Sequence, residues 1–203
     1  MKPGSDVSGI WAVVLAAGES SRMKSPKLVL PFRGRTIIEN VILNILDSDL
    51  KNIIVVTGAW RDELMEKITG LPVSHCFNEN YKSGMLSSVI CGLNSLPLDA
   101  EAAFIFQGDQ PGIDPEVVGI MIEKLKKSGR GIIIPVHKGK RGHPLLIDRK
   151  YFTRVSELDH ETGLRGLMLK FPDDITEVDV DNEIILRDID TKEDYLESIN
   201  KIN

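Results

Sequence analysis

Cysteine is scarce in this 203-residue sequence, which contains only Cys76 and Cys91. Two cysteines exclude a disulfide framework and a four-cysteine zinc site, and their apolar or mixed surroundings favour buried free thiols in a reducing compartment. Long apolar runs are also missing: none approaches the ~20 residues that span a membrane, and residues 1–9 lack the apolar core of a signal peptide. We therefore expect a soluble, cytoplasmic protein with no membrane among its partners.

Positive charge is in short supply as well. Lys and Arg number 25 against 30 for Asp and Glu, which gives a net charge of −5. Because a chain of this sign is a poor general ligand for polyanions, we expect no nucleic acid among its partners. An anionic substrate must instead be met by a local cluster of basic residues. The apolar fraction of 42% and the charged fraction of 27% are ordinary for globular proteins and exclude a disordered chain.

Short apolar runs rich in β-branched residues alternate with longer amphipathic stretches. The expected strands are residues 10–16, 53–57, 103–106, 131–136, 145–147, 175–180 and 184–188, and the expected helices are residues 36–48, 61–68, 86–96, 115–127, 164–170 and 193–199. The first four strands are continuously apolar, which is typical of strands covered on both faces. This order predicts an α/β fold with a Rossmann-like, doubly wound, mainly parallel sheet and helices on both faces.

The length predicts a single domain over residues 1–203, with residues 1–9 as a flexible N-terminus. No internal repeat or linker divides the sequence. Ligands of open α/β sheets bind at the carboxyl ends of the strands. The loops that follow Ala16, Thr57, Phe106 and Val136 are therefore the candidates for a functional site.

The first of these loops lacks both common nucleotide motifs. It has no G-x-G-x-x-G and no G-x-x-x-x-G-K-[ST], which argues against a dinucleotide Rossmann site and a P-loop. From Leu15 to Lys27 it reads LAAGESSRMKSPK. Small residues let a ligand approach the backbone, Gly18 can supply a positive φ, and Arg22 and Lys27 add charge suited to a phosphate chain. The alternative is a solvated turn with two incidental basic residues.

Aspartates follow two further apolar runs. Asp109 stands in the sequence Gly-Asp-Gln-Pro, where it is placed to hold a divalent cation or to cap a turn. Asp188 and Asp190 follow the run 184–186 and point to opposite faces if this segment is extended. Thr191 is a candidate N-cap of the last helix, and this role is compatible with a metal-binding Asp190.

Five motifs in order resemble the nucleotidyltransferases that join an NTP to a phosphorylated acceptor, and among them the molybdenum cofactor cytidylyltransferases. They are LAAG-x-S-x-RM with Lys27 after it, and residues 78–88, 108–111, 141–144 and 188–191, within a stretch from about 10 to 195. This family often has glycine after Arg-Met, where this chain has Lys24. The guanylyltransferases that it resembles usually carry Gly-Gly in place of Ala16-Ala17, a difference that favours cytosine.

The resemblance implies a role for each motif. Arg22, Lys27 and Asp109 would be catalytic, and Asp109 and Asp190 would bind Mg²⁺, with Mn²⁺ as the alternative metal. The implied nucleotide-binding residues are Leu15, Ala16, Ala17, Gly18, Arg22, Lys27, Asn78, Gly84, Ser88, Gly108 and Asp109, and the implied acceptor-binding residues are Arg141, Gly142, His143 and Pro144. Residues 163–166 would frame the acceptor pocket. We expect His143 to orient the acceptor rather than to act as a base, because a phosphate monoester is already ionised near neutral pH.

The expected reaction is in-line transfer of CMP from CTP to the terminal phosphate of molybdopterin. It gives a cytosine dinucleotide cofactor and pyrophosphate, and a molybdoenzyme that receives the cofactor is a further expected partner. Three alternatives stay open: guanylyl transfer to the same cofactor, nucleotidyl transfer to a sugar or alcohol phosphate, and a non-catalytic nucleotide-binding chaperone that delivers the cofactor. Pyrophosphate release, and the nucleotide that supports it, distinguish these classes.

Overall fold

The computed structural model describes residues 7–23 and 25–200. Its central sheet is built from β1 (Ile10–Ala16), β4 (Asn52–Thr57), β5 (Ser74–Phe77), β6 (Ala102–Gln107), β7 (Ile132–His137), β8 (Lys140–Arg141), β9 (Leu145–Asp148) and β10 (Ile175–Asp179). The strand order is β10-β7-β9-β6-β1-β4-β5, with β8 paired to β7. β1 runs parallel to β4 and β6, β4 to β5, and β7 to β10, whereas β8 and β9 run antiparallel to their neighbours. The mainly parallel sheet is thus confirmed.

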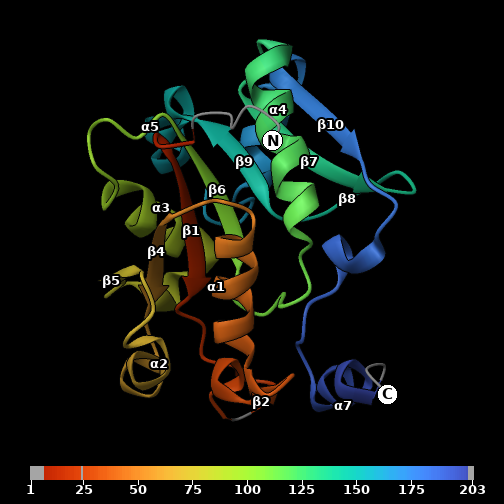
Figure 1. Cartoon of the computed structure of the whole chain (residues 1–203). Helices are drawn as coiled ribbons and strands as arrows, with labels where there is room; N and C mark the ends of the chain where they lie inside the picture. Colours follow the sequence, from red (N-terminus) through yellow and green to blue (C-terminus); the bar gives the residue numbers. More distant parts are fainter. Residues whose placement is uncertain (1–6, 24, 201–203) are drawn as a thin grey trace.

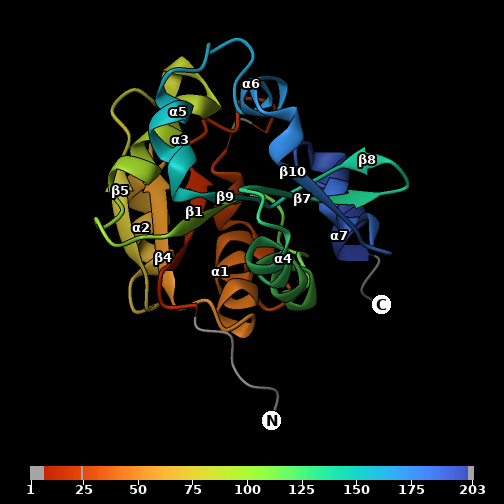
Figure 2. The same cartoon turned by 90° about the horizontal axis from the view of Figure 1, so that it is seen from above.

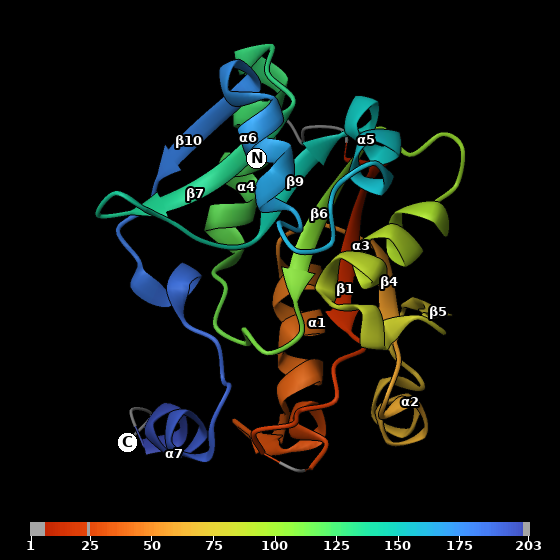
Figure 3. The ribbon, with the colours of Figure 1, turned by 180° about the vertical axis from the view of Figure 1, so that it is seen from behind.

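Helices cover both faces of the sheet. The helices of the described residues are α1 (Ile37–Asp47), α2 (Arg61–Ile68), α3 (Met85–Asn94), α4 (Pro115–Ser128), α5 (Phe152–Ser156), α6 (Arg165–Lys170) and α7 (Lys192–Asn200), and α7 lies apart from the sheet (Figure 1). Figure 1 shows α1 and α4 in front of the sheet, and Figure 3, from behind, shows α3, α5 and α6. The view from above places the sheet between these two groups (Figure 2). The predicted Rossmann-like α/β architecture is confirmed.

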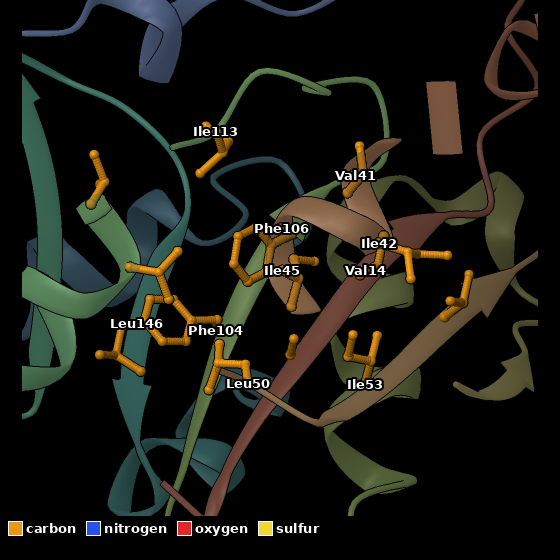
Figure 4. Packing of buried hydrophobic residues seen from close by; sticks show 14 of the residues in the cluster. Val14, Val41, Ile42, Ile45, Leu50, Ile53, Phe104, Phe106, Ile113 and Leu146 are labelled. Carbon is orange, nitrogen blue, oxygen red and sulfur yellow. The ribbon is translucent and has the colours of Figure 1, made fainter. Parts of the chain in front are cut away.

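Successive side chains of β1 enter two different apolar layers. Val14 is fully buried in the layer that α1 and α4 cover, and Val13 is fully buried in the layer of α3. Figure 4 shows the first layer, in which Ile42 and Ile45 of α1 pack against strand side chains such as Phe106 of β6. Because both faces are covered, no position of the strand has to be polar, which explains the continuous apolar runs in the sequence.

Two long helices begin and end at residues with a capping function. The Thr36 hydroxyl accepts from the Glu39 N–H at 3.4 Å, and the Glu39 carboxylate accepts from the Thr36 N–H at 2.7 Å, which forms a capping box for α1. Asp114 caps α4, with Pro115 at its first position, and Gly129 ends it in the left-handed conformation at φ 68°. Residues close in sequence thus fix both ends of α4.

The C-terminal part of the chain differs most from expectation. A strand over residues 184–188 is wrong, because Glu183–Leu186 form a 3₁₀ turn. Asn182 opens this turn by accepting from the Ile184 N–H at 3.0 Å, and such Asn side chains compete with extended pairing. The expected N-cap of α7 is confirmed, since the Thr191 hydroxyl accepts from the Asp194 N–H at 3.1 Å.

Several short elements were not expected. β5 is largely exposed at the sheet edge and has no apolar run, and α5 is only 5 residues long. A small hairpin of β2 (Pro31–Phe32) and β3 (Arg35–Thr36) precedes α1. Elements this short carry too few residues for a periodic pattern to identify them.

Other expectations concerned the chain end, the thiols and the membrane. Of residues 1–9, residues 1–6 lie outside the described part of the chain, and so does Lys24; the Ser8 carbonyl accepts from Asn52 at 2.6 Å and the Gly9 carbonyl from Glu101 at 2.8 Å. Cys76 and Cys91 are free thiols as expected, but both are only half-buried, with sulfurs 3.7 Å apart. No helix in residues 7–23 and 25–200 has the length and apolar character to cross a membrane.

Candidate active site

The carboxyl ends of β1 and β6 form the floor of a cavity of about 310 Å³. These strands are paired in register, with Leu15 opposite Gln107, and the Gly108 N–H donates to the Leu15 carbonyl at 3.0 Å. A side chain at Gly108 would place its Cβ 2.7 Å from that carbonyl oxygen, so only glycine allows this close approach. The cavity is lined by Leu15, Ala16, Ala17, Gly18, Ser20, Ser21, Arg22, Lys27, Leu28, Tyr81, Gly84, Met85, Ser88, Gln107, Asp109 and Asp190.

The loop after β1 curves over this floor without a positive φ at Gly18. Among the described residues of this loop, the left-handed one is Ser20, at φ 51°, so the predicted source of the turn was wrong. A Cβ at Gly18 would meet no atom within 4 Å. Glycine at this position therefore leaves open space on the cavity wall, where a ligand can approach the backbone.

The segment after β4 holds this loop from behind. The Ala59 N–H donates to the Ala17 carbonyl at 3.2 Å, and the Trp60 indole N–H donates to the Glu19 carbonyl at 2.9 Å. A Cβ at Gly58 would lie 2.5 Å from the Ala17 oxygen and 2.7 Å from the Ala17 Cβ. Gly58 and Trp60 are thus supporting residues that the sequence analysis missed, although the loop after Thr57 was among its candidates.

Two basic and two acidic residues meet in the cavity as one ion-pair cluster. Lys27 Nζ lies 2.7 Å from Asp109 Oδ2 and 2.8 Å from Asp190 Oδ1, and Arg22 also pairs with Asp190. A backbone bond joins the distant segments, because the Ile189 N–H donates to the Asp109 carbonyl at 3.0 Å. The formal charges of the four side chains cancel, so the cavity holds its cations and carboxylates in balance.

The ion pairs favour the charged forms of both Lys27 and Asp190. Burial alone would lower the pKa of Lys27, but the charge and hydrogen bond of Asp109, joined by Asp190, raise it above its usual value. The hydrogen bond from Lys27 lowers the pKa of Asp190, and Arg22 adds to this effect. Lys27 and Asp190 are therefore both charged at neutral pH.

One carboxylate oxygen of Asp109 takes no part in these ion pairs. Oδ1 is buried and accepts no hydrogen bond from the described residues. Asp188 does not belong to the cluster; it lines a separate cavity between the β2–β3 hairpin and α7. Asp188 is exposed, but partial desolvation of its carboxyl group together with the charge of Asp190 raises its pKa. Asp190 and Asp188 thus lie in different cavities, as the alternation argument predicts.

The segment of residues 78–88 contributes one wall, but not through Asn78. Asn78 is buried; its amide donates to Ser87 Oγ at 2.9 Å and to Ser88 Oγ at 3.0 Å. Gly84, at φ 94°, and Ser88 line the cavity together with Tyr81. Asn78 therefore positions the start of α3 by binding Ser87 and Ser88. Of these three residues, only Ser88 lines the cavity described above, where it can meet a ligand.

A second cavity, of about 650 Å³, opens beside the first and contains the turn after β8. Arg141, Gly142 and His143 line it, whereas Pro144 is buried behind them. Arg141 Nε pairs with Glu177 at 2.7 Å near the surface. The opposite wall is the stretch 160–165, which includes residues 163–165 of the expected frame. Gln107 and Met85 line both cavities.

The turn of residues 141–144 is fixed by backbone bonds. The Gly142 N–H donates to the Pro135 carbonyl and the His143 N–H to the Ile185 carbonyl, both at 2.9 Å. A Cβ at Gly142 would lie 2.4 Å from the Ile185 oxygen. Burial lowers the pKa of His143, so its imidazole is neutral at pH 7.

Comparison with known proteins identifies the family. The model of the MobA-like NTP transferase domain matches residues 12–175. The chain belongs to this family. Among curated relatives, the molybdenum cofactor cytidylyltransferase of Escherichia coli is 31% identical to this chain, over 94% of this chain and 95% of that protein. A probable molybdenum cofactor guanylyltransferase of Natranaerobius thermophilus is 32% identical, over 75% of this chain and 73% of that one.

A solved nucleotidyl transferase from Methanothermobacter has the same fold. It superposes with a TM-score of 0.80 at 25% identity, over 95% of this chain and 96% of that one. The chain is thus a nucleotidyltransferase, and the expected enzyme class is confirmed. Identity to the cytidylyl and guanylyl relatives is nearly equal, so it does not choose the base.

Proposed function

We propose that this nucleotidyltransferase transfers CMP from CTP to the terminal phosphate of molybdopterin. The observation that carries the proposal is the pair of joined cavities. One holds the small-residue loop with Arg22, Lys27, Asp109 and Asp190, and the other holds the turn with His143. The E. coli relative, a molybdenum cofactor cytidylyltransferase, matches over nearly the whole chain, and the Ala16-Ala17 pair favours cytosine over guanine.

The carboxylates of Asp109 and Asp190 fit a divalent cation. Both line the first cavity, which we call the nucleotide cavity, and the buried Asp109 Oδ1 has no partner among the described residues. One or two carboxylates completed by substrate phosphates are the usual protein ligands of Mg²⁺. Asp109 and Asp190 would hold Mg²⁺, or Mn²⁺ as the alternative, and the bound ion would neutralise charge on the phosphate oxygens.

Lys27 has to move for this to happen, because its ammonium now bridges both carboxylates. We infer that Lys27 and Arg22 exchange the carboxylates for phosphate oxygens when the nucleotide binds. Each would then donate to the α-phosphoryl group or to the leaving pyrophosphate, where negative charge develops. The open space at Gly18 leaves room for the nucleotide against the loop.

The acceptor phosphate would approach from the second cavity, which we call the acceptor cavity. An oxygen of its monoester attacks the α-phosphorus, the bond from that phosphorus to the bridging oxygen breaks, and pyrophosphate leaves. The attacking group is already ionised, so the chain has no need of a general base. His143 is neutral and half-buried in the lining of this cavity, in keeping with an orienting role, whereas Arg141 is exposed. A molybdoenzyme that accepts the product completes the proposed partners.

The test is pyrophosphate release by the full chain with purified molybdopterin, with CTP and GTP assayed separately. We expect release that requires both substrates and is faster with CTP. Release that favours GTP would make the enzyme a guanylyltransferase. Nucleotide binding without release would favour the non-catalytic chaperone, and turnover only with a sugar or alcohol phosphate would reassign the acceptor.

A further inference from the structure

Gln107 lies at the point where the two cavities meet. It is the last residue of β6, it faces Leu15 across the β1–β6 pair, and it lines both cavities. The preceding strand residues are apolar and buried. Met85, which also lines both cavities, is apolar. Gln107 is therefore the polar side chain that can act on a group passing from one cavity to the other.

The amide of Gln107 has a defined orientation. Its Nε2 lies 2.7 Å from His143 Nε2. An amide nitrogen can only donate, so the imidazole nitrogen accepts, and the ring proton then sits on the buried Nδ1, which has no partner among the described residues. This agrees with the burial of His143, which keeps the ring neutral. Because the His143 backbone is bound to the Ile185 carbonyl at 2.9 Å, the acceptor nitrogen has a fixed place.

The bond to His143 uses only part of the amide. A carboxamide has two N–H groups and one oxygen, and in the described part of the chain the Gln107 side chain forms only this one hydrogen bond. Its oxygen is not among the buried, unpartnered atoms. The second N–H and the oxygen are thus left for a ligand at the junction of the cavities.

The surroundings indicate which ligand that is. On the nucleotide side, phosphate oxygens already have Arg22 and Lys27 as donors. On the acceptor side, Leu86, Ile134 and Leu145 line the cavity with carbon, and its basic side chains are Arg165 and Arg141, the second of which pairs with Glu177; Gln107 is the polar residue of this lining that also reaches the first cavity. A phosphate group that reaches this end of the acceptor cavity meets the free N–H of Gln107.

We propose that Gln107 donates to the phosphate monoester of the acceptor and turns it toward the nucleotide, with His143 as the positioning residue that fixes the amide. This inference rests on the proposed function, because the phosphorylated acceptor brings the anion to the junction. The N–H binds a non-attacking oxygen of the phosphate. Another oxygen of the same group then points at the α-phosphorus.

The first test replaces Gln107 by methionine, which keeps the length of the side chain but has no N–H. We expect kcat/KM for molybdopterin to fall about 100-fold, the usual cost of one oriented donor. The dissociation constant of CTP, measured by calorimetry, should stay within about threefold of wild type. Gln107→Glu, which also lacks the N–H and adds a negative charge, should lower the same kcat/KM further.

The second test separates positioning by His143 from a merely structural role. His143→Leu should reproduce the Gln107→Met defect, whereas His143→Gln should restore part of the activity, since its side-chain oxygen can accept from Gln107. The double variant Gln107→Met/His143→Leu should be no slower than either single variant, because both changes remove one interaction. Additive losses, or no rescue by His143→Gln at an unchanged Tm, would overturn the positioning role.

The outcomes distinguish this inference from the proposed function. If wild type turns over and Gln107→Met stays within about twofold of it, the inference is wrong and the proposed function stands. If wild type binds molybdopterin without releasing pyrophosphate, the proposed function is wrong, and the affinity of Gln107→Met for molybdopterin decides. About tenfold weaker binding supports the contact with Gln107, and unchanged binding overturns it. A wild type that does not bind molybdopterin overturns both.

Discussion

The two cavities differ in how their charge is arranged. The nucleotide cavity, about 310 Å³, holds two cations and two carboxylates in direct contact, with Lys27 Nζ within 2.8 Å of both acids. The acceptor cavity, about 650 Å³, has its ion pair between Arg141 and Glu177 near the surface and a neutral His143 inside. We therefore propose that the first cavity supplies the charge for the chemical step and that the second recognises the acceptor. Substitutions in the two cavities should therefore fail in different ways.

Asp109→Asn should reduce turnover more than any other substitution considered in the nucleotide cavity. It removes a carboxylate that contacts Lys27 and is proposed to hold the metal, so we expect kcat to fall about 1,000-fold. Pyrophosphate release measures the effect, and circular dichroism checks that the fold is intact. Asp188→Asn is the matched control, because Asp188 lines a different cavity and should lose far less. Near-normal release by Asp109→Asn with unchanged metal dependence would contradict its role.

Lys27→Met and Arg22→Ala should each lower kcat about 100-fold. Both residues are proposed to leave their carboxylates and stabilise charge that develops on the phosphates. CTP affinity, measured by calorimetry, should change much less than kcat. If only the affinity changes, Arg22 and Lys27 bind the nucleotide and do not act in the transition state.

Arg141→Ala should affect the acceptor cavity alone. The side chain lines this cavity near Glu177, and loss of one charged contact of about 1.4 kcal/mol raises KM for molybdopterin about tenfold. The KM for CTP should not change. Steady-state kinetics with each substrate varied in turn measure both constants, and equal effects on both would remove the distinction between the cavities.

Ala17→Gly should shift base choice by a few-fold only. A methyl group can contribute roughly 1–3 kcal/mol of discrimination, but the Ala17 side chain is 4% exposed and faces Gly58. The substitution thus acts mainly through the loop backbone. The ratio of kcat/KM for CTP over GTP should fall modestly without inverting. An unchanged ratio would move base selection to the 78–88 segment, where Ser88→Ala is the next variant to measure.

Asp174→Asn should lower stability while leaving turnover intact. Burial would raise the pKa of Asp174, but bonds from Lys150, Tyr151 and the Gly131 N–H outweigh it and lower the pKa below 3.8. The carboxylate therefore stabilises the fold above pH 3.8, and this contribution disappears as the pH falls through the folded-state value. With solvent screening of Lys150, we expect about 1 kcal/mol at pH 7. Urea unfolding of the wild type and of Asp174→Asn at pH 7 and pH 3 measures this contribution. If the two proteins differed in unfolding free energy by the same amount at both pH values, the assignment would be contradicted.

The sequence predicted the sheet and which loops meet at the candidate site, because both depend on local patterns. Continuous apolar runs identified the buried strands, and strand ends identified the loop from Leu15 to Lys27 and Asp109. The alternation of Asp188 and Asp190 was enough to place them on opposite sides, although the strand assigned to residues 184–188 was wrong. Local capping by Asn182 decided that turn, and apolar content alone could not reveal it.

The contacts between distant segments could not be predicted in this way. The bridge of Lys27 to both carboxylates depends on the bond between Ile189 and Asp109, which no periodicity encodes. The same holds for Gln107 and His143, which are 36 residues apart. Asn78 looked like a ligand-binding residue, but its partners Ser87 and Ser88 bury it. Side chains of similar chemistry are told apart only by the packing around them.

The most direct test of the account is a competition assay with equal CTP and GTP, purified molybdopterin and Mg²⁺. Mass spectrometry of the dinucleotide product reports base and acceptor in one measurement. We predict that the cytosine dinucleotide of molybdopterin predominates, with one pyrophosphate released for each product molecule. A guanine dinucleotide as the main product, or nucleotide consumption without any pterin dinucleotide, would contradict the account.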